Sequence, residues 1–482
     1  MEQIKQGFRP RMNTLYRQIA DELAEDIEQG IYTAGQKVPS VRQMAKKRAV
    51  SITTINQAYG LLEDRGFIRS KPQSGYFVRD GLKLVSAPPP MSSGGEPEEI
   101  TKSEIITQIL SNRGHSDLID LGAAIPDLSF TPYRALQLQI QKASRFQARE
   151  VFNYVFSPGY EPLRNQIAIR MREVGVRCHA DDIIITHGCA EAIALSLRSN
   201  TQPGDIVAVE SPCYYGFLQQ ANILGLKVIE IPTDPSTGIS VDALTLALQQ
   251  WPIKIVAVTS RYSNPTGATL SEQKQRELVA LAKRFDIKIM EDDIYGELGF
   301  GEPIRTVLKS FDDDGRVMYC SSFSKTISPG LRIGWMIPGK HIKSVINNQM
   351  FNTFSPSALG QISMYSYLQT GHFDKHLRNL RKTYAENTDR IIDAVRQYFP
   401  EGTRVSKPKG GFILWVCLPK NVNVVQLRNE CLRHNINIVP GDVFSNGDEF
   451  SNFMRLNCAI PWGDRVQNAL KTVGLLAGNH CR

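Results

Sequence analysis

The residues with the clearest capacity for chemistry lie in segment 321–335, SSFSKTISPGLRIGW. Here Lys325 stands among small hydroxyl residues after an apolar run, and Arg332 follows seven positions later. A lysine that loses its solvation can deprotonate and form an imine with an aldehyde. The hydroxyls of Ser322 and Ser324, with the guanidinium of Arg332, would suit a phosphate dianion held beside it. An aldehyde together with a phosphate predicts pyridoxal 5'-phosphate as the cofactor, with Lys325 as the catalytic residue.

Two residues upstream match the needs of that cofactor. An acid must keep its pyridine nitrogen protonated, so that the ring acts as an electron sink, and its phenolic oxygen needs a donor. Asp292, 33 residues before Lys325, and Tyr295, three residues after Asp292, offer this pair. An EDD triplet is usually only a solvated turn, so this interpretation depends on the fold bringing the residues together.

The elements that must position these residues alternate along the C-terminal part of the chain. Several apolar runs end in polar or turn-forming residues, and helical stripes separate most of them. This alternation predicts an α/β sheet with helices on its faces, whose ligands bind beyond the carboxyl ends of the strands. The predicted strands are 183–186, 206–210, 254–259, 287–292 and 317–322.

Further motifs surround these strands: YVFSPGYEPLR at 154–164, THGCAEA, ESPCYYG, SNPTG and FMRLNCA. Taken singly each has an ordinary explanation, since a lone NPTG is simply a turn. In this order, and with this spacing, they resemble the class I and II aminotransferases of fold type I over roughly residues 117–478. The resemblance implies an α/β domain of that fold that binds pyridoxal 5'-phosphate.

The resemblance also implies a role for the residues of the first three motifs. Tyr154 would reach the cofactor phosphate of a partner subunit. The backbone amides of Cys189 and Ala190 would bind the phosphate at a helix N-terminus, where unpaired N–H groups and the dipole favour an anion. Tyr214 would stack on the pyridine ring.

The last two motifs complete the implied site. Asn264 would donate to the phenolic oxygen together with Tyr295. The resemblance also assigns Asp292 to the ring nitrogen, Lys325 to the imine and Arg332 to the phosphate. Near the end of the chain, Arg455 would clamp the α-carboxylate of a substrate or effector in a bidentate manner.

A separate compact pattern precedes this region. Apolar residues repeat at i+4 from 14 to 29 and predict an amphipathic helix. Ser40 and Gln43 form an S-x-x-Q capping box that opens a short second helix. A third helical stripe begins at Ser51, and the segments FIRS and YFV predict two short strands joined by a turn. Three helices and a hairpin predict a winged helix-turn-helix.

In such a domain the third helix enters the major groove of DNA. Periodicity alone is also compatible with a partner-docking module. The strings VPSVRQMA, VSITTINQAYGLLEDRGFI and QSGYFV, however, resemble the GntR-type winged helix over residues 12–79, with a departure at Ile52, where many members carry a basic residue. The expected contacts are Thr53, Thr54, Asn56 and Gln57 on base edges, Ser40 and Arg42 on phosphates, and Lys71, Gln73 and Ser74 on the wing.

Between these regions, residues 80–102 contain three consecutive prolines and SSGGEPEE, a composition typical of a linker. The predicted organisation is a winged helix at 12–79, a linker at 80–102 and an aminotransferase-like domain at 103–482. This order resembles the MocR subfamily of bacterial transcription regulators. The resemblance implies a homodimer in which each linker carries its winged helix over the partner subunit. Binding to double-stranded operator DNA would then respond to the cofactor or to a small amine or amino acid.

Two functions from different classes are compatible with the sequence. The first is a DNA-binding transcription regulator that holds pyridoxal 5'-phosphate as an imine on Lys325 and uses exchange of that imine as its sensor. The second is an active aminotransferase whose N-terminal domain only docks it to DNA, because Asp292, Lys325 and Arg455 are all retained. Whether the protein is an enzyme stays open, since transamination also needs a second half-reaction and product release.

Composition and charge exclude several other classes. With 482 residues, of which 42 % are hydrophobic and 22 % charged, the chain is expected to be globular and soluble. It has no run of about 20 apolar residues and no signal peptide, so we expect a cytoplasmic protein without membrane partners. Residues 1–80 hold 13 Lys and Arg against 9 Asp and Glu, so half of the net charge of +8 lies there, as a polyanion partner would favour.

The cysteine and histidine patterns argue against metal or disulfide scaffolds. The eight cysteines include no CxxC pair, so we expect buried free thiols. His372 and His376 are four residues apart, but the sequence offers no third ligand nearby, and no metal site is expected.

Overall fold

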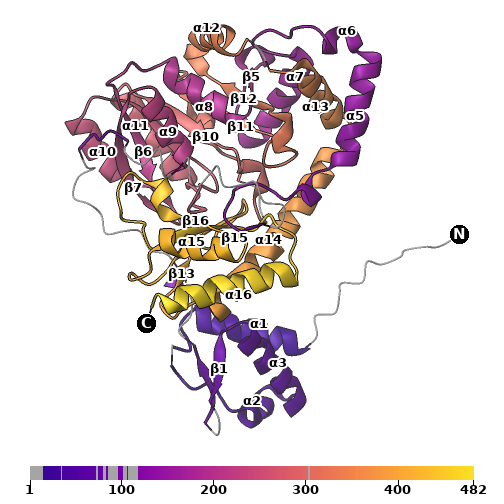
Figure 1. Cartoon of the computed structure of the whole chain (residues 1–482), viewed down its shortest axis with the longest axis vertical. Coiled ribbons are helices and arrows are strands. Elements are labelled where there is room, and N and C mark those ends of the chain that lie inside the picture. The colour runs from indigo at the N-terminus through magenta and orange to yellow at the C-terminus, as the bar shows by residue number, and fades with distance from the viewer. Residues whose placement is uncertain are drawn as a thin grey trace, which may run out of the picture.

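The structure is a computed structural model of the whole chain, and it describes residues 15–33, 35–71, 74–79, 83–84, 96–100, 106, 118–301, 304–354 and 356–481. These residues form a small N-terminal unit and a larger C-terminal unit, which lie at the bottom and top of Figure 1. Within these ranges no helix combines the length and the apolar character that a membrane span requires.

The N-terminal unit is the winged helix-turn-helix that the sequence predicts. It consists of α1 (Leu15–Glu28), α2 (Val41–Arg48), α3 (Ile52–Asp64) and an antiparallel hairpin of β1 (Ile68–Lys71) and β2 (Gly75–Val78). The expected capping box is present: the Gln43 amide donates to the Ser40 hydroxyl, and the Ser40 amide donates to the Gln43 side chain at 2.9 Å. Ile19, Ile55 and Tyr59 belong to the buried cluster that the helices share.

The C-terminal unit is built on an eight-stranded sheet in the order β5-β12-β11-β10-β9-β6-β7-β8. The central strands pair in parallel, whereas β12 runs antiparallel between β11 and β5. All five predicted strands are present, and β7, β8 and β12 are additional. Their bounds are β5 (Ile184–Thr186), β6 (Ile206–Ser211), β7 (Lys227–Asp234), β8 (Gly238–Ile239), β9 (Ile253–Thr259), β10 (Lys288–Asp292), β11 (Val317–Ser322) and β12 (Gly334–Ile337).

Helices cover both faces of this sheet, as the fold class requires. Side chains that alternate along β9 separate into two buried clusters: Ala257 packs in one, and Val256 and Val258 pack in the other. The first cluster includes α8 (Cys189–Arg198), α9 (Tyr215–Ile223) and α12 (Ile342–Asn352), and the second includes α10 (Val241–Gln250) and α11 (Glu272–Arg284). The remaining helices beside the sheet are α5 (Tyr133–Phe146), α6 (Ala148–Val151), α7 (Glu161–Met171) and α13 (Ala358–Gln369).

A second sheet, which the sequence analysis did not predict, lies below the first and has the order β16-β17-β14-β13-β3. Several of its strands have only two residues, too few for a periodic signal. Its strands are β3 (Lys83–Leu84), β13 (Arg404–Val405), β14 (Ile413–Cys417), β16 (Val439–Pro440) and β17 (Phe453–Asn457), and a separate pair joins β4 (Ile119–Asp120) to β15 (Ile436–Asn437). Helices α14 (His372–Tyr398), α15 (Val424–Arg433) and α16 (Asp464–Asn479) accompany it.

The predicted linker, 80–102, lies largely outside the described residues. Its described pieces pack on the C-terminal unit: Lys83–Leu84 pairs in parallel with β13, and Glu98 exchanges two backbone hydrogen bonds with Val228. Ile100 is buried in the same cluster as α8. The domain boundaries at 79 and 103 stay predictions.

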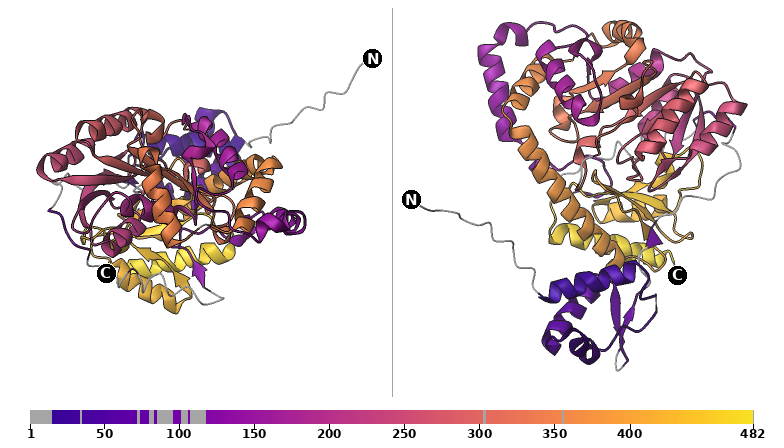
Figure 2. Two further views of the ribbon diagram at one scale, coloured as in Figure 1. Left: turned by 90° about the horizontal axis from the view of Figure 1, so that it is seen from above. Right: turned by 180° about the vertical axis from the view of Figure 1, so that it is seen from behind.

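The two units are in contact within one chain. Figures 1 and 2 place the winged helix beneath α16 and the C-terminal end of the long helix α14. The expected position of the winged helix over a partner subunit stays a prediction.

Candidate functional site

The polar residues singled out in the sequence meet at one edge of the large sheet. Asp292 ends β10, and its register partners are Thr259 on β9 and Cys320 on β11. The ends of these three parallel strands therefore lie side by side, with Ser322 at the end of β11. This edge, beyond the carboxyl ends of the strands, is where α/β sheets bind ligands.

The Asp292 carboxylate is buried in this edge, with 4 % of the residue exposed. Its Oδ1 accepts hydrogen bonds from the Ile294 amide at 3.0 Å and from the Cys189 thiol at 3.5 Å. Burial raises the pKa of Asp292 to about 6, although the Ile294 amide and the positive charge of Lys325 act in the opposite direction. A cationic group placed against this carboxylate would favour its ionised form.

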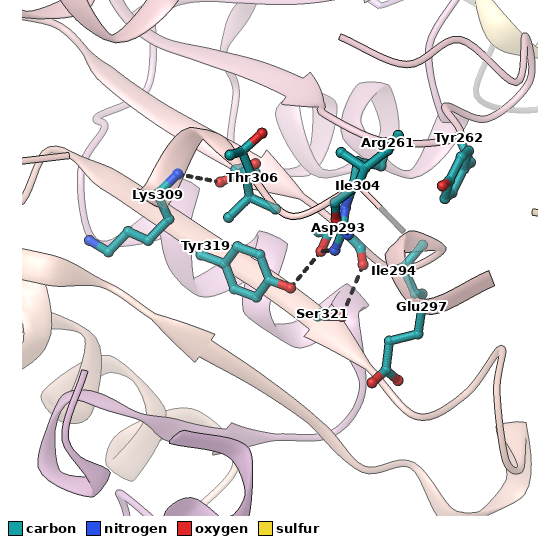
Figure 3. Close-up of polar contacts among 12 residues, drawn as sticks. Arg261, Tyr262, Asp293, Ile294, Glu297, Ile304, Thr306, Lys309, Tyr319 and Ser321 are labelled. Carbon is teal, nitrogen blue, oxygen red and sulfur yellow. Dashed lines mark hydrogen bonds and ion pairs between the residues drawn. The ribbon is translucent and has the colours of Figure 1, made fainter. Parts of the chain in front are cut away.

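The neighbouring carboxylate, Asp293, is paired with the guanidinium of Arg261. Figure 3 shows Arg261 and Tyr319 pointing toward it: Arg261 Nε donates to Oδ1 at 2.8 Å, its Nη2 donates to Oδ2, and the Tyr319 hydroxyl donates to Oδ2 at 2.6 Å. The Ser321 hydroxyl donates to the Asp293 carbonyl at 3.1 Å. The sequence analysis did not single out Arg261, whose one signal was a charged residue two positions after the predicted strand 254–259.

Lys325 faces the same region. Its Nζ donates to the Ala124 carbonyl at 2.6 Å and lies 5.9 Å from the centroid of the Tyr295 ring. Tyr295 is 2 % exposed, and burial raises the pKa of its hydroxyl. The contact with Ala124 adds a segment near residue 124 that the sequence analysis did not include.

A cradle forms where Arg332 meets the loop before α8. Arg332 Nη2 donates to the His187 carbonyl at 2.7 Å, and Nη1 lies 3.4 Å from the Ser324 hydroxyl. Gly188 has φ +75°, and a Cβ there would stand 2.6 Å from Arg332 Nη2. Glycine is therefore required both by its backbone conformation and by the close approach of the guanidinium.

Hydroxyls and helix amides complete this cradle. The Ser322 and Ser324 hydroxyls are 2.7 Å apart, and Ser322 donates to the Ile333 carbonyl at 3.0 Å. Cys189 is the first residue of α8 and is followed by Ala190, so both amides lie in the first helical turn, where N–H groups have no intrahelical acceptor. The structure thus brings these four predicted residues and Arg332 together.

Arg455 reaches the site from β17 of the second sheet. It is 1 % exposed; its Nε donates to the Gly122 carbonyl at 2.9 Å and its Nη1 donates to Asn264 Oδ1 at 3.0 Å. Its Nη2 is buried and has no hydrogen-bond partner among the residues that the structure describes. Burial lowers the pKa of this guanidinium. An unsatisfied buried cationic donor is costly, which is the condition that an anionic ligand would relieve.

The two predicted tyrosines differ in placement. Tyr214 directly follows the loop after β6 and precedes α9; burial raises its pKa, and the charge of Asp292 acts in the same direction. Tyr154 is 66 % exposed, and its ring packs against Phe156 at 5.5 Å and Phe354 at 5.4 Å between centroids. Tyr154 therefore does not contact the site around Lys325 of its own chain.

The predicted DNA-contacting residues lie on the winged helix. On α3, Thr53, Asn56 and Gln57 are exposed, whereas the hydroxyl of the half-buried Thr54 lies 2.8 Å from the Ser51 hydroxyl that caps the helix. Arg42 is exposed on α2, and Ser40 caps that helix. On the wing, Lys71 Nζ lies 4.7 Å from the centroid of Phe77 and Ser74 is exposed, whereas Gln73 lies outside the described residues.

Seven of the eight cysteines are buried, as predicted, whereas Cys481 is half-buried. Across the described ranges, no three His, Cys, Asp or Glu side chains are grouped as metal ligands. One nitrogen of His376 instead lies 2.7 Å from the Thr326 carbonyl.

Comparison with known families separates the chain at the same place as the fold. Residues 116–473 match the family described as aminotransferase class I and II, and residues 15–78 match the bacterial regulatory proteins of the gntR family.

Individual relatives match either the whole chain or its C-terminal part. YjiR of Escherichia coli, described as an uncharacterized HTH-type transcriptional regulator, is 41 % identical over 96 % of this chain and 98 % of its own length. The aromatic-amino-acid aminotransferase 1 of Thermococcus litoralis is 31 % identical over 77 % of this chain and 90 % of its own. The crystal structure of Pyrococcus horikoshii kynurenine aminotransferase superposes with a TM-score of 0.73 at 28 % identity, over 80 % of this chain and 96 % of that one.

Proposed function

This chain belongs to the class I and II aminotransferase family, and it joins that domain to a gntR-type DNA-binding domain, as MocR regulators do. We propose that the C-terminal domain is a sensor of pyridoxal 5'-phosphate and an amino acid. Transcription regulation is its function, in common with relatives that match over nearly the whole chain. The observation that carries the sensor proposal is the buried Arg455 Nη2, which has no hydrogen-bond partner among the described residues, while Nη1 of the same guanidinium contacts Asn264.

The residues present fit the cofactor. The buried carboxylate of Asp292 suits a protonated ring nitrogen, since a cation there offsets the cost of burying it. Asn264 and Tyr295 would bind the phenolic oxygen, and the Tyr214 ring would lie against the pyridine. When bound, the cofactor supplies an aldehyde for the Lys325 amine and a ring that accepts electrons.

The cradle around Arg332 fits the phosphate group. A guanidinium binds a phosphate dianion strongly, and the amides at the start of α8 favour negative charge. Arg332 is already oriented by the His187 carbonyl, so little rotamer freedom is lost on binding. Ser322, Ser324, Cys189 and Ala190 would supply the remaining donors.

Arg455 determines the chemical class of the effector. A free carboxylate would satisfy the Nη2 atom and compensate a cation that is 1 % exposed. An amine without a carboxylate would leave Nη2 without a hydrogen-bond acceptor and the buried positive charge without a compensating anion. We therefore favour an amino acid over a simple amine as the effector.

A second copy of the chain is the expected partner. Tyr154, Phe156 and Phe354 pack against one another at the surface, and the neighbouring Phe152 and Phe351 are 83 % and 84 % exposed. Exposed aromatic groups of this extent mark interaction surfaces. In a homodimer that covers this surface, Tyr154 would be placed to reach the partner's cofactor phosphate.

DNA binding is proposed to use the exposed residues of α3 and the wing. Thr53, Asn56 and Gln57 are short and polar at the start of a helix that a major groove can admit. Ile52 is 51 % exposed beside them, so phosphate contacts on this side would depend on Arg42 of α2. An effector can change DNA affinity only through its differential affinity for two arrangements of the units.

The test is fluorescence anisotropy of the cofactor-loaded protein on its own upstream intergenic DNA at two salt concentrations, with absorbance followed as amino acids are added. A ligand that changes the cofactor absorbance and the DNA affinity together supports the sensor. A Lys325→Ala variant that keeps the full effector response would refute it.

The competing function is catalysis, because the chain retains Lys325, Asp292 and Arg455. Sustained product formation from an amino acid and 2-oxoglutarate, without saturable DNA binding, would identify an aminotransferase instead. A single spectral change that stops after one equivalent would favour the sensor.

A further inference from the structure

A cavity of about 720 Å³ lies between the winged helix and the C-terminal unit. Its upper wall is formed by Val395 and Arg396 in the last turn of α14, by residues 399–404 that lead from α14 to β13, and by residues 418–420 after β14. Its lower wall is the base of the wing hairpin, with Arg69 on β1 and Arg79 directly after β2. Neither unit forms this cavity alone, and it is separate from the site around Lys325.

The lining is strongly cationic. Five positive side chains line it, those of Arg69, Arg79, Arg396, Arg404 and Lys420, and among the lining residues that the structure describes Glu401 is the one carboxylate. Arg396 forms an ion pair with Asp393 at 3.0 Å, and Arg404 contacts the Cys417 sulfur at 3.3 Å. Like charges gathered between two docked units repel one another, so an anion in the cavity would stabilise this arrangement.

We propose that this cavity binds a small molecule that carries two or more phosphate groups. Arginine forks bind phosphate in a bidentate manner. With Arg396 paired to Asp393, the described lining residues carry three positive charges in excess. A phosphate monoester carries about −1.5 to −2 near neutral pH, so two such groups balance this excess. The volume is also that of a typical small-molecule site, roughly 300–1,000 Å³, and exceeds the needs of inorganic phosphate.

The position of the cavity favours a small molecule over operator DNA. The wing tip near Lys71 and Ser74 lies at the end of the hairpin opposite Arg79, and the hairpin base faces β13. Figure 1 shows the wing extending away from the C-terminal unit. Because both units line the cavity, a bound anion favours the docked state over any state in which they separate.

The test is isothermal titration calorimetry of the full chain, loaded with pyridoxal 5'-phosphate so that the cradle at Arg332 is filled. Pyrophosphate and ATP are the probes. We expect saturable binding of one anion per chain, weakened at least tenfold in the double variant Arg79→Gln/Lys420→Gln. Lys471→Gln removes an exposed charge on α16 outside the cavity and should bind as the wild type does.

The outcomes separate the sources of the phosphate groups. Equal affinity for the two probes would mean that the phosphate chain alone is recognised, and tighter ATP binding would mean that the nucleoside is held as well. No saturable binding, or binding that the double variant retains and Arg42→Gln removes, would overturn the proposal, because the anion would then occupy the DNA-binding face.

Discussion

The guanidinium carbon of Arg396, near the end of α14, lies 3.9 Å from the centroid of the Phe67 ring in the winged helix. The same guanidinium donates to the Arg65 carbonyl at 3.3 Å. Between them Gly66 has φ +73°, and a Cβ there would stand 2.9 Å from Arg396 Cγ. The Arg396 side chain of the C-terminal unit thus contacts three consecutive residues after α3: Arg65, Gly66 and Phe67.

Replacing Arg396 by alanine should loosen the docking of the winged helix. The variant loses a cation–π contact and a hydrogen bond, together about 1–3 kcal/mol of docking free energy. Calorimetry should then show an earlier, separate transition for the winged helix, and proteolysis of the chain between the units should accelerate. Arg390→Ala, an exposed arginine on the same helix, is the control. Unchanged proteolysis in Arg396→Ala would mean that other contacts dominate.

Replacing Lys325 by alanine should abolish covalent retention of pyridoxal 5'-phosphate after borohydride reduction, measured by mass spectrometry of the intact chain. The phosphate cradle at Arg332 is untouched by this change, so weak reversible binding should persist. Lys343→Ala, an exposed lysine on α12, should retain full labelling. Labelling of Lys325→Ala at the wild-type level would show that another amine holds the cofactor.

Replacing Arg455 by glutamine should weaken the response to amino acids by about 10- to 100-fold, the value of a charge-assisted hydrogen bond. The response to the corresponding decarboxylated amine should change much less, since it has no carboxylate for Nη2. Arg455→Lys tests whether charge without the fork suffices. Absorbance titration with both ligands provides the measurement. An equal loss for amine and amino acid would indicate a damaged site rather than a lost carboxylate contact.

Glu210 should make the stability of the protein depend on pH. Its side chain accepts from the Thr259 amide at 2.9 Å, and its Oε1 is buried with no partner within the described part of the chain. Burial raises the pKa of Glu210 from 4.5 to about 8. The folded state thus binds the proton more tightly than the unfolded state, and this stabilisation is lost as pH rises through about 8.

The variant Glu210→Gln should therefore gain stability over the wild type as pH rises from 5 to 9. The gain should be on the order of 3–5 kcal/mol at the upper end, from about 1.4 kcal/mol per pKa unit. Paired thermal melts of cofactor-free protein across this range give the difference, with the exposed Glu277→Gln as control. A constant difference between wild type and Glu210→Gln would contradict the prediction.

Two changes on the winged helix should separate base reading from phosphate contact. Asn56→Ala should weaken operator binding by about 1–3 kcal/mol while leaving binding to unrelated DNA unchanged. Arg42→Gln should weaken both and lower the slope of log affinity against log salt by about 1. Anisotropy with operator and scrambled duplexes at several salt concentrations measures these quantities. Equal effects of Asn56→Ala on both duplexes would show that Asn56 does not contact base edges.

Local patterns sufficed for the elements whose signals are short in range. The capping box at Ser40 and the five buried strands of the large sheet follow from neighbouring residues, because caps and apolar runs act over a few positions. The motifs around Asp292 and Lys325 likewise pointed to one edge of a sheet, since parallel strands end at the same side.

Only the tertiary structure decided which distant groups meet. Arg261 neutralises Asp293 across 32 residues, and Arg455 reaches Asn264 across 191 residues from a sheet whose short strands give no periodic signal. The same holds for Arg396 on Phe67 and for the cationic cavity beside it. The sequence determined the kinds of chemistry available, because side-chain type and local spacing are written in it. Packing decided that Asp293 is compensated by Arg261 and that Arg455 keeps a donor available for a ligand, because long-range contacts arise only when the whole chain has folded.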